Sequence, residues 1–553
     1  MEAGAPSSAL CSGAECCVLK RIRMLVPVGF KTEIKALSKL AGPVVLAQTM
    51  VFAVSFVSTI FCGHLGRTEL AGVALAIAVI NVTGVSIGSG LSSACDTLIS
   101  QIFGSGNLLK VGVILQRAVL ILLLACFPCW AILINTEPIL LAVRQEPEVA
   151  RLAQMYVKIF MPALPATFMY SLETRYLQNQ GIIWPQVITG FVVNLLNALI
   201  NYIVLHALNL GVAGSAVANT ISQITMAGTL YAYIIWKGLH KATWGGWSKE
   251  CLKDWGSYIH LAIPSMVMMC VEWWTYEIGG FLAGLISEVE LGAQSVVYEL
   301  SNIAYMFPMG FSIAGSVRVG NALGAGETEQ AKLSAKLTMF CAGSVSVCLS
   351  VLIGSLKDHI SYIFTYDEQI RERVADVISL YAPFVLLEAV SAASGGIIRG
   401  AGKQGVGAVC NIVGYYGVGF PIGVPLMFAA KLGIKGLWTG LFTCVSLQSS
   451  FLIFYLLRMN WKKATVDAQI RAGVCGSSTD TIPQSDNPGN TEDQSDTVEL
   501  VDIEAGPAVT TVEEELSYST LVLRRGLALA AMLFILAAGI ILNLLLTNLV
   551  MST

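Results

Sequence analysis

Long runs of apolar residues separated by short polar breaks dominate this chain and predict helices that cross a membrane. A helix of about 20 apolar residues is long enough to span the hydrocarbon core of a bilayer. The pattern predicts thirteen such spans. They lie at approximately 36–62, 70–94, 111–134, 152–178, 186–208, 212–236, 257–284, 292–316, 331–356, 372–398, 406–430, 434–458 and 526–549.

Polar breaks divide the chain into six predicted parts. We expect a cytoplasmic tail at 1–35, a first set of six spans (N-lobe) at 36–236 and a basic linker at 237–256. A second set of six spans (C-lobe) follows at 257–460, then a linker at 461–523 and a thirteenth membrane helix at 524–549. The second linker is polar and acidic without apolar periodicity, which is typical of disorder.

The distribution of basic residues predicts the orientation in the membrane. Lys and Arg gather before the first span, after the sixth and after the twelfth, and such loops face the cytoplasm. We therefore expect a cytoplasmic N-terminus, and thirteen spans place the C-terminus outside the cell.

The two sets of six spans are related by an internal repeat. Several short matches recur in the same order at an offset of about 221 residues, and six spans return the chain to its starting side, so the repeats are parallel. Parallel repeats are typical of transporters with a substrate site between the halves. Matched pairs at this offset are Leu40-Ala41-Gly42-Pro43 with Leu261-Ala262-Ile263-Pro264, Asn81 with Asn302 and Pro162 with Pro383. Arg175 matches Arg399 at an offset that is about three residues larger.

Composition agrees with an all-α polytopic membrane protein. Only 12% of the residues are charged and the mean hydropathy is +0.70, whereas a soluble chain has about 25% charged residues. Cysteines inside apolar runs predict free thiols, and the histidines lack zinc-site spacing. Glycine-rich loops lack a phosphate-binding signature. We expect no enzyme activity, catalytic residue, metal, cofactor or nucleic-acid partner.

Four glutamates inside predicted spans of the C-lobe are the candidates for chemistry. A charge at the bilayer centre costs roughly 2.5–3.5 kcal/mol on insertion scales, so such residues usually face a cavity or a partner. The alternative for each is a hydrogen-bonded or protonated core residue. The four acids are Glu272 and Glu277 in span 7, Glu299 in span 8 and Glu388 in span 10.

Helical spacing separates two of these acids. Glu272 and Tyr276 share one helix face, whereas Glu277 lies about 140° around the helix from Glu272. A carboxyl in apolar surroundings can carry a proton near neutral pH, and ionised it attracts an organic cation. Competition of proton and cation for one acid is sufficient for antiport, and Glu272 is the stronger candidate.

Aromatic and amide side chains near these acids are candidates for a cation-binding cavity. Faces of Trp and Tyr attract cations by up to about 2 kcal/mol when desolvated. Membrane-interface belts and simple packing are the alternative roles. The candidates are Trp273, Trp274, Tyr276, Tyr298 and Tyr305, with Gln48 and Asn81 from the first half.

Two loops and three acid-bearing segments resemble the multidrug and toxin extrusion (MATE) family, and the acid-bearing segments resemble its vertebrate branch. The loops are Val317-Arg318-Val319-Gly320-Asn321-Ala322-Leu323-Gly324-Ala325-Gly326 and Gln178-Asn179-Gln180-Gly181, and the segments are Glu272-Trp273-Trp274, Tyr298-Glu299-Leu300 and Leu387-Glu388. The resemblance covers approximately residues 35–465, and the thirteenth span also fits vertebrate members.

This resemblance implies two six-helix lobes in a V around a central cavity, and proton-driven export of organic cations from the plasma membrane. The resemblance implies that four acids take part in transport, namely Glu272, Glu277, Glu299 and Glu388. It also implies that the aromatic and amide candidates line the substrate cavity. We expect small organic cations, protons and the lipid bilayer as partners, and a functional monomer.

Two departures and two alternatives limit what the resemblance carries over. No Asp occurs between Ala41 and Phe61, where some prokaryotic proton-coupled members use one, and Val385 stands where some vertebrate members have a histidine. Sodium coupling stays open, because carboxylate and amide oxygens also suit sodium. A lipid-linked flippase is disfavoured because the predicted mid-span charges are acidic, not basic.

Overall fold

Almost all of the described chain is helical. The computed structural model describes residues 28–62, 65–474 and 517–552, and no strand occurs among them. The helices of the first half are α2 (Phe30–Cys62), α3 (Arg67–Ile80), η1 (Asn81–Val85), α4 (Ser86–Ser92), α5 (Ala94–Ser105), α6 (Leu108–Ile134), α7 (Thr136–Ala142), α8 (Pro147–Phe160), η2 (Met161–Ala163), α9 (Leu164–Gln178), α10 (Trp184–Tyr202), η3 (Ile203–Ala207) and α11 (Gly211–Lys237).

The short helix η4 (Lys249–Leu252) precedes the helices of the second half. These are α12 (Trp255–Gly284), α13 (Glu288–Gly324), α14 (Thr328–Ser355), η5 (Ile360–Ile363), α15 (Glu368–Ala401), α16 (Gln404–Asn411), η6 (Ile412–Gly419), α17 (Phe420–Phe428) and α18 (Ile434–Arg458). The helices α19 (Trp461–Ala472) and α20 (Tyr518–Ser552) complete the described chain.

All thirteen predicted spans coincide with helical segments. Nine segments of the described chain are apolar and long enough to cross a membrane by length and composition. The helical segments of predicted spans 4, 6, 7 and 8 do not meet this combined criterion of length and apolar composition. Three of them, α11, α12 and α13, are nevertheless longer than 25 residues. Spans 7 and 8 carry three of the four candidate acids, and span 4 is divided by η2 into helices of 14 and 15 residues.

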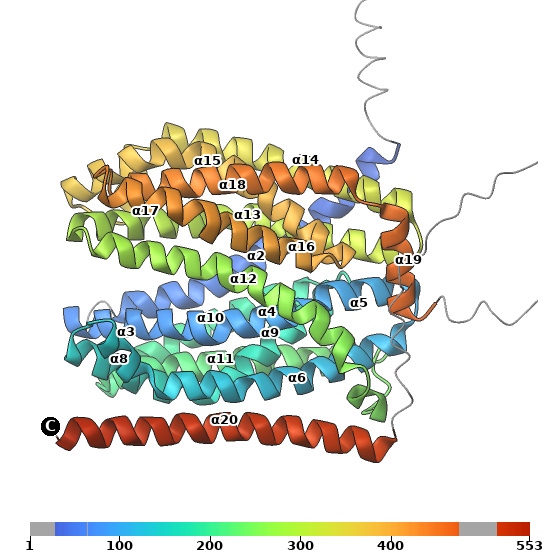
Figure 1. Ribbon diagram of the computed structural model, residues 1–553, viewed down its shortest axis with the longest axis horizontal. Helices are drawn as coiled ribbons and strands as arrows, with labels where there is room; N and C mark the ends of the chain where they lie inside the picture. The colour runs from blue at the N-terminus through green and yellow to red at the C-terminus, as the bar shows by residue number, and fades with distance from the viewer. Residues whose placement is uncertain (1–27, 63–64, 475–516, 553) are drawn as a thin grey trace, which may run out of the picture.

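Two separate hydrophobic cores define two lobes, which lie one above the other in Figure 1. The first core is built mainly from α3–α11, with Phe168 and Tyr156 among its largest buried side chains. The second is built from α12–α18 around Trp438 and Tyr381. Two cores of this kind are what two packed repeats of six spans require.

The first helix of each lobe packs against both lobes. In α12, Tyr258 and Leu261 belong to the first core, whereas Val271 and Ala283 belong to the second. In α2, the early residues Leu37 and Ala41 pack with Ala314 and Leu337 of the C-lobe, and Val54 packs with Val193 and Met226 of the N-lobe. Pro43 and Pro264, matched in the repeat, lie between the two halves of their helices.

The linker after span 12 begins with regular structure, which corrects the prediction of disorder from residue 461. Residues Trp461–Ala472 form α19, because Asn460 caps its first turn and three alanines form its buried face. Ala464, Ala468 and Ala472 are spaced by one turn and are fully buried. The rest of the predicted disordered segment, 475–516, lies outside the described residues, as do residues 1–27 of the predicted tail.

The thirteenth helix lies alongside the N-lobe (Figure 1). It begins at Tyr518, earlier than predicted, and packs along α6. The Asn135 amide donates to the Gly539 carbonyl at 3.1 Å, and the Asn543 amide donates to the Ile134 carbonyl at 3.1 Å. A Cβ at Gly539 would meet Ala131 at 2.8 Å, so this glycine lets the two backbones approach closely.

Candidate functional site

Two of the four candidate glutamates face one internal cavity of the C-lobe. Glu272 comes from α12 and Glu388 from α15, and both side chains line an enclosed volume of about 30 Å³. Glu388 is only 8% exposed. The other lining residues come from α12, α13, α15, α16, η6 and α18, and they are Met268, Tyr305, Ser391, Ala392, Gly395, Arg399, Gly407, Asn411, Tyr415, Val445 and Leu452.

Polar groups surround the acids of this cavity, and one of them binds Glu388. The Tyr276 hydroxyl donates to Oε1 of Glu388 at 3.2 Å, which joins α12 to α15. The Asn411 amide donates to the Met268 carbonyl at 2.9 Å. Tyr305 and Arg399 line the same cavity, so the acids lie among hydroxyl groups and one guanidinium. This arrangement can bind a proton or a small cation between two carboxyl groups.

The cavity is too small for a drug-sized ligand in this conformation. A cavity volume of about 30 Å³ has room for roughly one to three water molecules. Pockets for drug-sized molecules measure roughly 300–1,000 Å³. An organic cation therefore requires space beside this cavity as well as the acids themselves.

The other two glutamates lie apart from the cavity. Glu299 follows Tyr298 directly in α13, Glu277 lies in α12, and neither acid lines the cavity. The rings of Tyr276 and Tyr298 are 5.9 Å apart, so aromatic side chains connect the two pairs of acids. The structure thus separates the four acids into two pairs.

The predicted tryptophans are the most exposed of the candidates. Trp273 is 37% exposed and Trp274 is 36% exposed. The Trp274 indole donates to the Val82 carbonyl of η1 at 3.0 Å, across the boundary between the lobes. Asn81, at the start of η1, therefore lies next to the segment that Trp274 contacts.

The two amides predicted from the first half do not line the acid cavity. Gln48 lies in α2 and Asn81 in η1, and both are partly buried. Neither is brought together with the glutamates, because the cavity is enclosed by helices of the C-lobe alone.

Sequence reasoning missed Arg399, Asn411 and Tyr415 as site residues. Arg399 was already visible as an arginine directly after predicted span 10 and as the repeat partner of Arg175. A charge at the end of a span is costly unless it has a partner or reaches water, so this position could have been singled out. For Asn411 and Tyr415 no sequence signal separates them from other polar residues of span 11.

A family sequence model matches the two halves of this chain separately. The sequence model of the MatE family matches the chain twice, at residues 43–203 and 264–424. These matches cover more than half of the chain and begin 221 residues apart, the offset of the internal repeat. The chain belongs to the MatE family.

Curated relatives of this MatE chain match nearly its whole length. Multidrug and toxin extrusion protein 1 of Danio rerio is 63% identical over 95% of this chain and 92% of that protein. The protein of the same name from Homo sapiens is 53% identical over 93% of each chain. The predicted resemblance to the vertebrate branch is thereby confirmed.

A solved structure confirms the predicted MatE fold class. The crystal structure of the eukaryotic MATE transporter AtDTX14 is 28% identical, with a TM-score of 0.77, over 80% of this chain and all of that one. The all-helical architecture, the family and the apolar helices together identify a multi-span membrane transporter and not an enzyme.

Proposed function

We propose that this protein exports small organic cations from the cell in exchange for protons, by alternating access. The observation that carries the proposal is the convergence of Glu272 and Glu388 on one enclosed cavity. Two negative charges in such a volume repel each other, and either a proton or a cation relieves the repulsion. Exclusion of one by the other at these carboxyls is the basis of the exchange.

The names of the relatives support the substrate class. Proteins from zebrafish and human that share more than half of this sequence are named multidrug and toxin extrusion proteins. Partly exposed Trp273 and Trp274 provide ring faces for a desolvated organic cation, with an attraction of up to about 2 kcal/mol. A cation that contacts these rings lies about one helical turn from Glu277, because Trp273 and Trp274 precede it by four and three residues.

The arrangement of the two lobes supports alternating access. The helices that cross between lobes, α2 and α12, each pack with residues of both lobes. At the end that carries α19, further hydrogen bonds join the lobes, for example from Gln101 to the Gly400 carbonyl at 2.9 Å. Parallel repeats of this kind exchange access by movement of one lobe against the other.

The orientation and setting of the protein follow from the distribution of basic residues. We place the N-terminus and α19 on the cytoplasmic side of the plasma membrane and the C-terminus outside. A single chain contains both lobes and the acid cavity, so the functional unit that we propose is a monomer.

Transport into vesicles tests the proposal. Reconstituted vesicles with an acidic lumen and neutral exterior are expected to take up tetraethylammonium, and a protonophore should abolish the uptake. Glu272→Gln should abolish it too, whereas Glu329→Gln, whose side chain is 86% exposed on α14, should not. Uptake that persists after the proton gradient has collapsed contradicts proton coupling.

Sodium coupling is distinguished in the same vesicles. Ser391 and Asn411 add uncharged oxygens to the two carboxyls of the cavity, and such oxygens also suit a sodium ion. Replacing sodium by potassium at fixed pH should leave uptake unchanged if protons drive it. A loss of uptake on that replacement favours sodium instead.

A further inference from the structure

Asp96 of α5 is a buried carboxylate with partners inside its own lobe. It is 7% exposed. Nη1 of Arg175, from α9, lies 2.5 Å from its Oδ2, and the Asn179 amide donates to its Oδ1 at 3.3 Å. The N-lobe therefore holds this acceptor in a fixed position and supplies a positive charge that compensates it.

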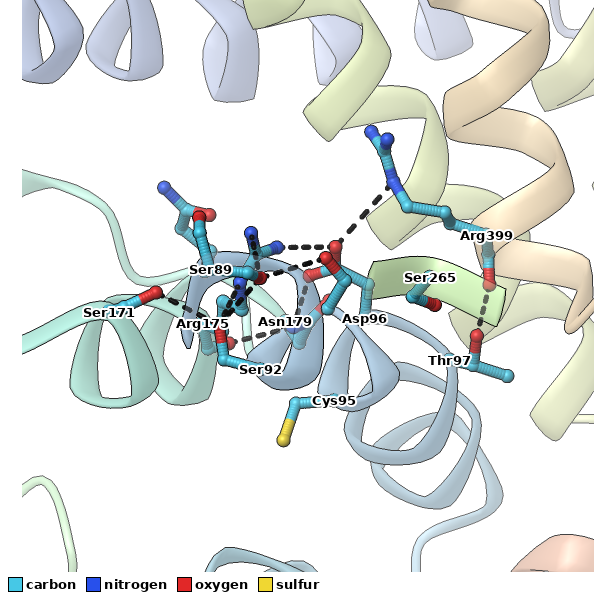
Figure 2. Close-up of polar contacts among 12 residues, drawn as sticks. Ser89, Ser92, Cys95, Asp96, Thr97, Ser171, Arg175, Asn179, Ser265 and Arg399 are labelled. Atoms are coloured by element: carbon cyan, nitrogen blue, oxygen red, sulfur yellow. Dashed lines mark hydrogen bonds and ion pairs between the residues drawn. The ribbon is translucent and has the colours of Figure 1, made fainter. Parts of the chain in front are cut away.

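A second arginine approaches the same oxygen from the other lobe. Nε of Arg399, from α15, lies 3.6 Å from Oδ2 of Asp96. Figure 2 shows Arg175 and Arg399 reaching the carboxylate from different sides. Asp96 is thus shared between the lobes, whereas its contact with Arg175 lies entirely within the N-lobe.

The internal repeat explains why Arg399 turns to the other lobe. Arg175 and Arg399 are repeat partners, so each occupies the same place in its own lobe. The offset of 221 residues, however, puts Val317 at the position of Asp96. The C-lobe therefore has an arginine without the matching acid, and the nearest equivalent carboxylate belongs to the N-lobe.

The contact between Arg399 and Asp96 is loose enough to break. A separation of 3.6 Å is an ion pair without hydrogen-bond geometry, and the buried Nε has no hydrogen-bond partner. Another nitrogen of Arg399 donates to the Ser312 hydroxyl at 3.1 Å, within the C-lobe. A guanidinium with five donors is only partly satisfied by this arrangement.

Backbone contacts around the pair close the same part of the boundary. The Thr97 hydroxyl donates to the Arg399 carbonyl, and the Gln101 amide donates to the Gly400 carbonyl at 2.9 Å. In α6, Lys110 donates to the Arg471 carbonyl of α19 at 2.7 Å. These hydrogen bonds form only while the lobes are in contact at this end, and they break when the lobes move apart.

We propose that Arg399 is a latch between the lobes, whose contact with Asp96 keeps this end of the transporter closed and breaks when this end opens. The inference rests on the alternating-access part of the proposed function. Arg399 also lines the cavity of Glu272 and Glu388, so the latch lies directly beside the acids.

Hydrogen–deuterium exchange of the purified full chain tests the latch without any transport assay. Peptides from α5 and α19 report whether the lobes are together at this end. Arg399→Gln is expected to raise their exchange rates about fivefold, the effect of losing one partly buried ion pair. Because no substrate is present, this result is independent of whether the protein exchanges protons for organic cations.

Two matched variants separate the latch from a merely local role. Arg175→Gln removes the partner of Asp96 inside the N-lobe, and Ser312→Ala removes the partner of Arg399 inside the C-lobe. Ser312→Ala should leave exchange in α19 within about twofold of the parent, whereas Arg175→Gln leaves Asp96 without its partner in the N-lobe and should raise exchange in α9 more than in α19. The charge-conserving Arg399→Lys should keep at least part of the protection that Arg399→Gln loses.

Several results would overturn the latch. One is unchanged exchange in α5 and α19 of Arg399→Gln. Another is an equal rise in α19 of Arg175→Gln, since that residue does not cross the boundary. A third is exchange in Arg399→Lys as fast as in Arg399→Gln, which assigns the effect to lost packing and not to charge.

Discussion

The Tyr276 hydroxyl donates a hydrogen bond of 3.2 Å to Glu388, so a residue of α12 fixes an acid of α15. Tyr276 is one helical turn from Glu272 on the same helix. Helical spacing therefore predicted Tyr276 beside Glu272, whereas the structure shows that its hydroxyl binds Glu388.

Removing that hydroxyl should weaken proton-driven uptake. Tyr276→Phe loses one hydrogen bond to a carboxyl group, worth about 1.5 kcal/mol, which corresponds to roughly a tenfold fall in kcat/KM. The measurement is initial uptake of tetraethylammonium into vesicles with a fixed proton gradient. Tyr298→Phe is the matched control, because Tyr298 lies outside the cavity, and an equal fall in both variants contradicts a specific role for Tyr276.

The two pairs of acids should respond differently to neutralisation. Glu272→Gln and Glu388→Gln remove carboxyls of the cavity and are expected to abolish uptake driven by a proton gradient. Glu277→Gln and Glu299→Gln are expected to raise KM for the cation and to retain proton-driven uptake, because these acids do not line the cavity. Proton-driven uptake that survives in either cavity variant contradicts this division.

Glu33 should stabilise the closed end of the bundle. It is 2% exposed and accepts two hydrogen bonds from Arg318, at 3.0 and 2.6 Å, and one each from Gln330 and Ser334 at 2.6 Å. Glu33→Gln weakens several charge-assisted hydrogen bonds and is expected to cost about 2 kcal/mol of stability. The midpoint of thermal unfolding in detergent should fall.

The exposed Glu329 is the control for this change. Its ion pair with Lys332 lies on the surface, so Glu329→Gln should change stability by less than about 0.5 kcal/mol. Equal destabilisation by the two substitutions contradicts the assignment.

Close packing between the lobes should depend on Gly324. A Cβ at this position would collide with the Gln101 backbone carbonyl of α5. Gly324→Ala therefore forces the helices apart and is expected to raise hydrogen–deuterium exchange in α5. Gly343→Ala is the matched control, since a Cβ there meets nothing within 4 Å. If hydrogen–deuterium exchange in α5 is unchanged in Gly324→Ala as well as in the control, the prediction is contradicted.

The docking of α20 should be separable from transport. Gly539→Leu prevents the close approach of α20 to α6, and it is expected to lower the unfolding midpoint while uptake stays within about twofold. Gly526→Leu, on the same helix with no neighbour at its Cβ, should change neither. Loss of uptake in Gly539→Leu alone shows that α20 acts on the lobes.

The sequence by itself determined the helices and their division into two repeats. Membrane spans are readable because each needs about 20 apolar residues whatever its neighbours are. The repeat is readable because matched residues such as Pro43 and Pro264 keep one offset. The same local signals failed at Trp461–Ala472, where a polar sequence forms a helix because its alanine face packs on both lobes.

Only the tertiary structure decided which polar residues meet. Glu272 and Glu388 lie on different helices, so their common cavity depends on how α12 and α15 pack, which helical spacing does not encode. The same holds for Arg399, whose sequence position matches Arg175 but whose nearest acid, Asp96, belongs to the other lobe. The spacing of residues along one helix determines which side chains are neighbours within a turn. Contacts between two helices depend on how the side-chain surfaces of both helices fit together.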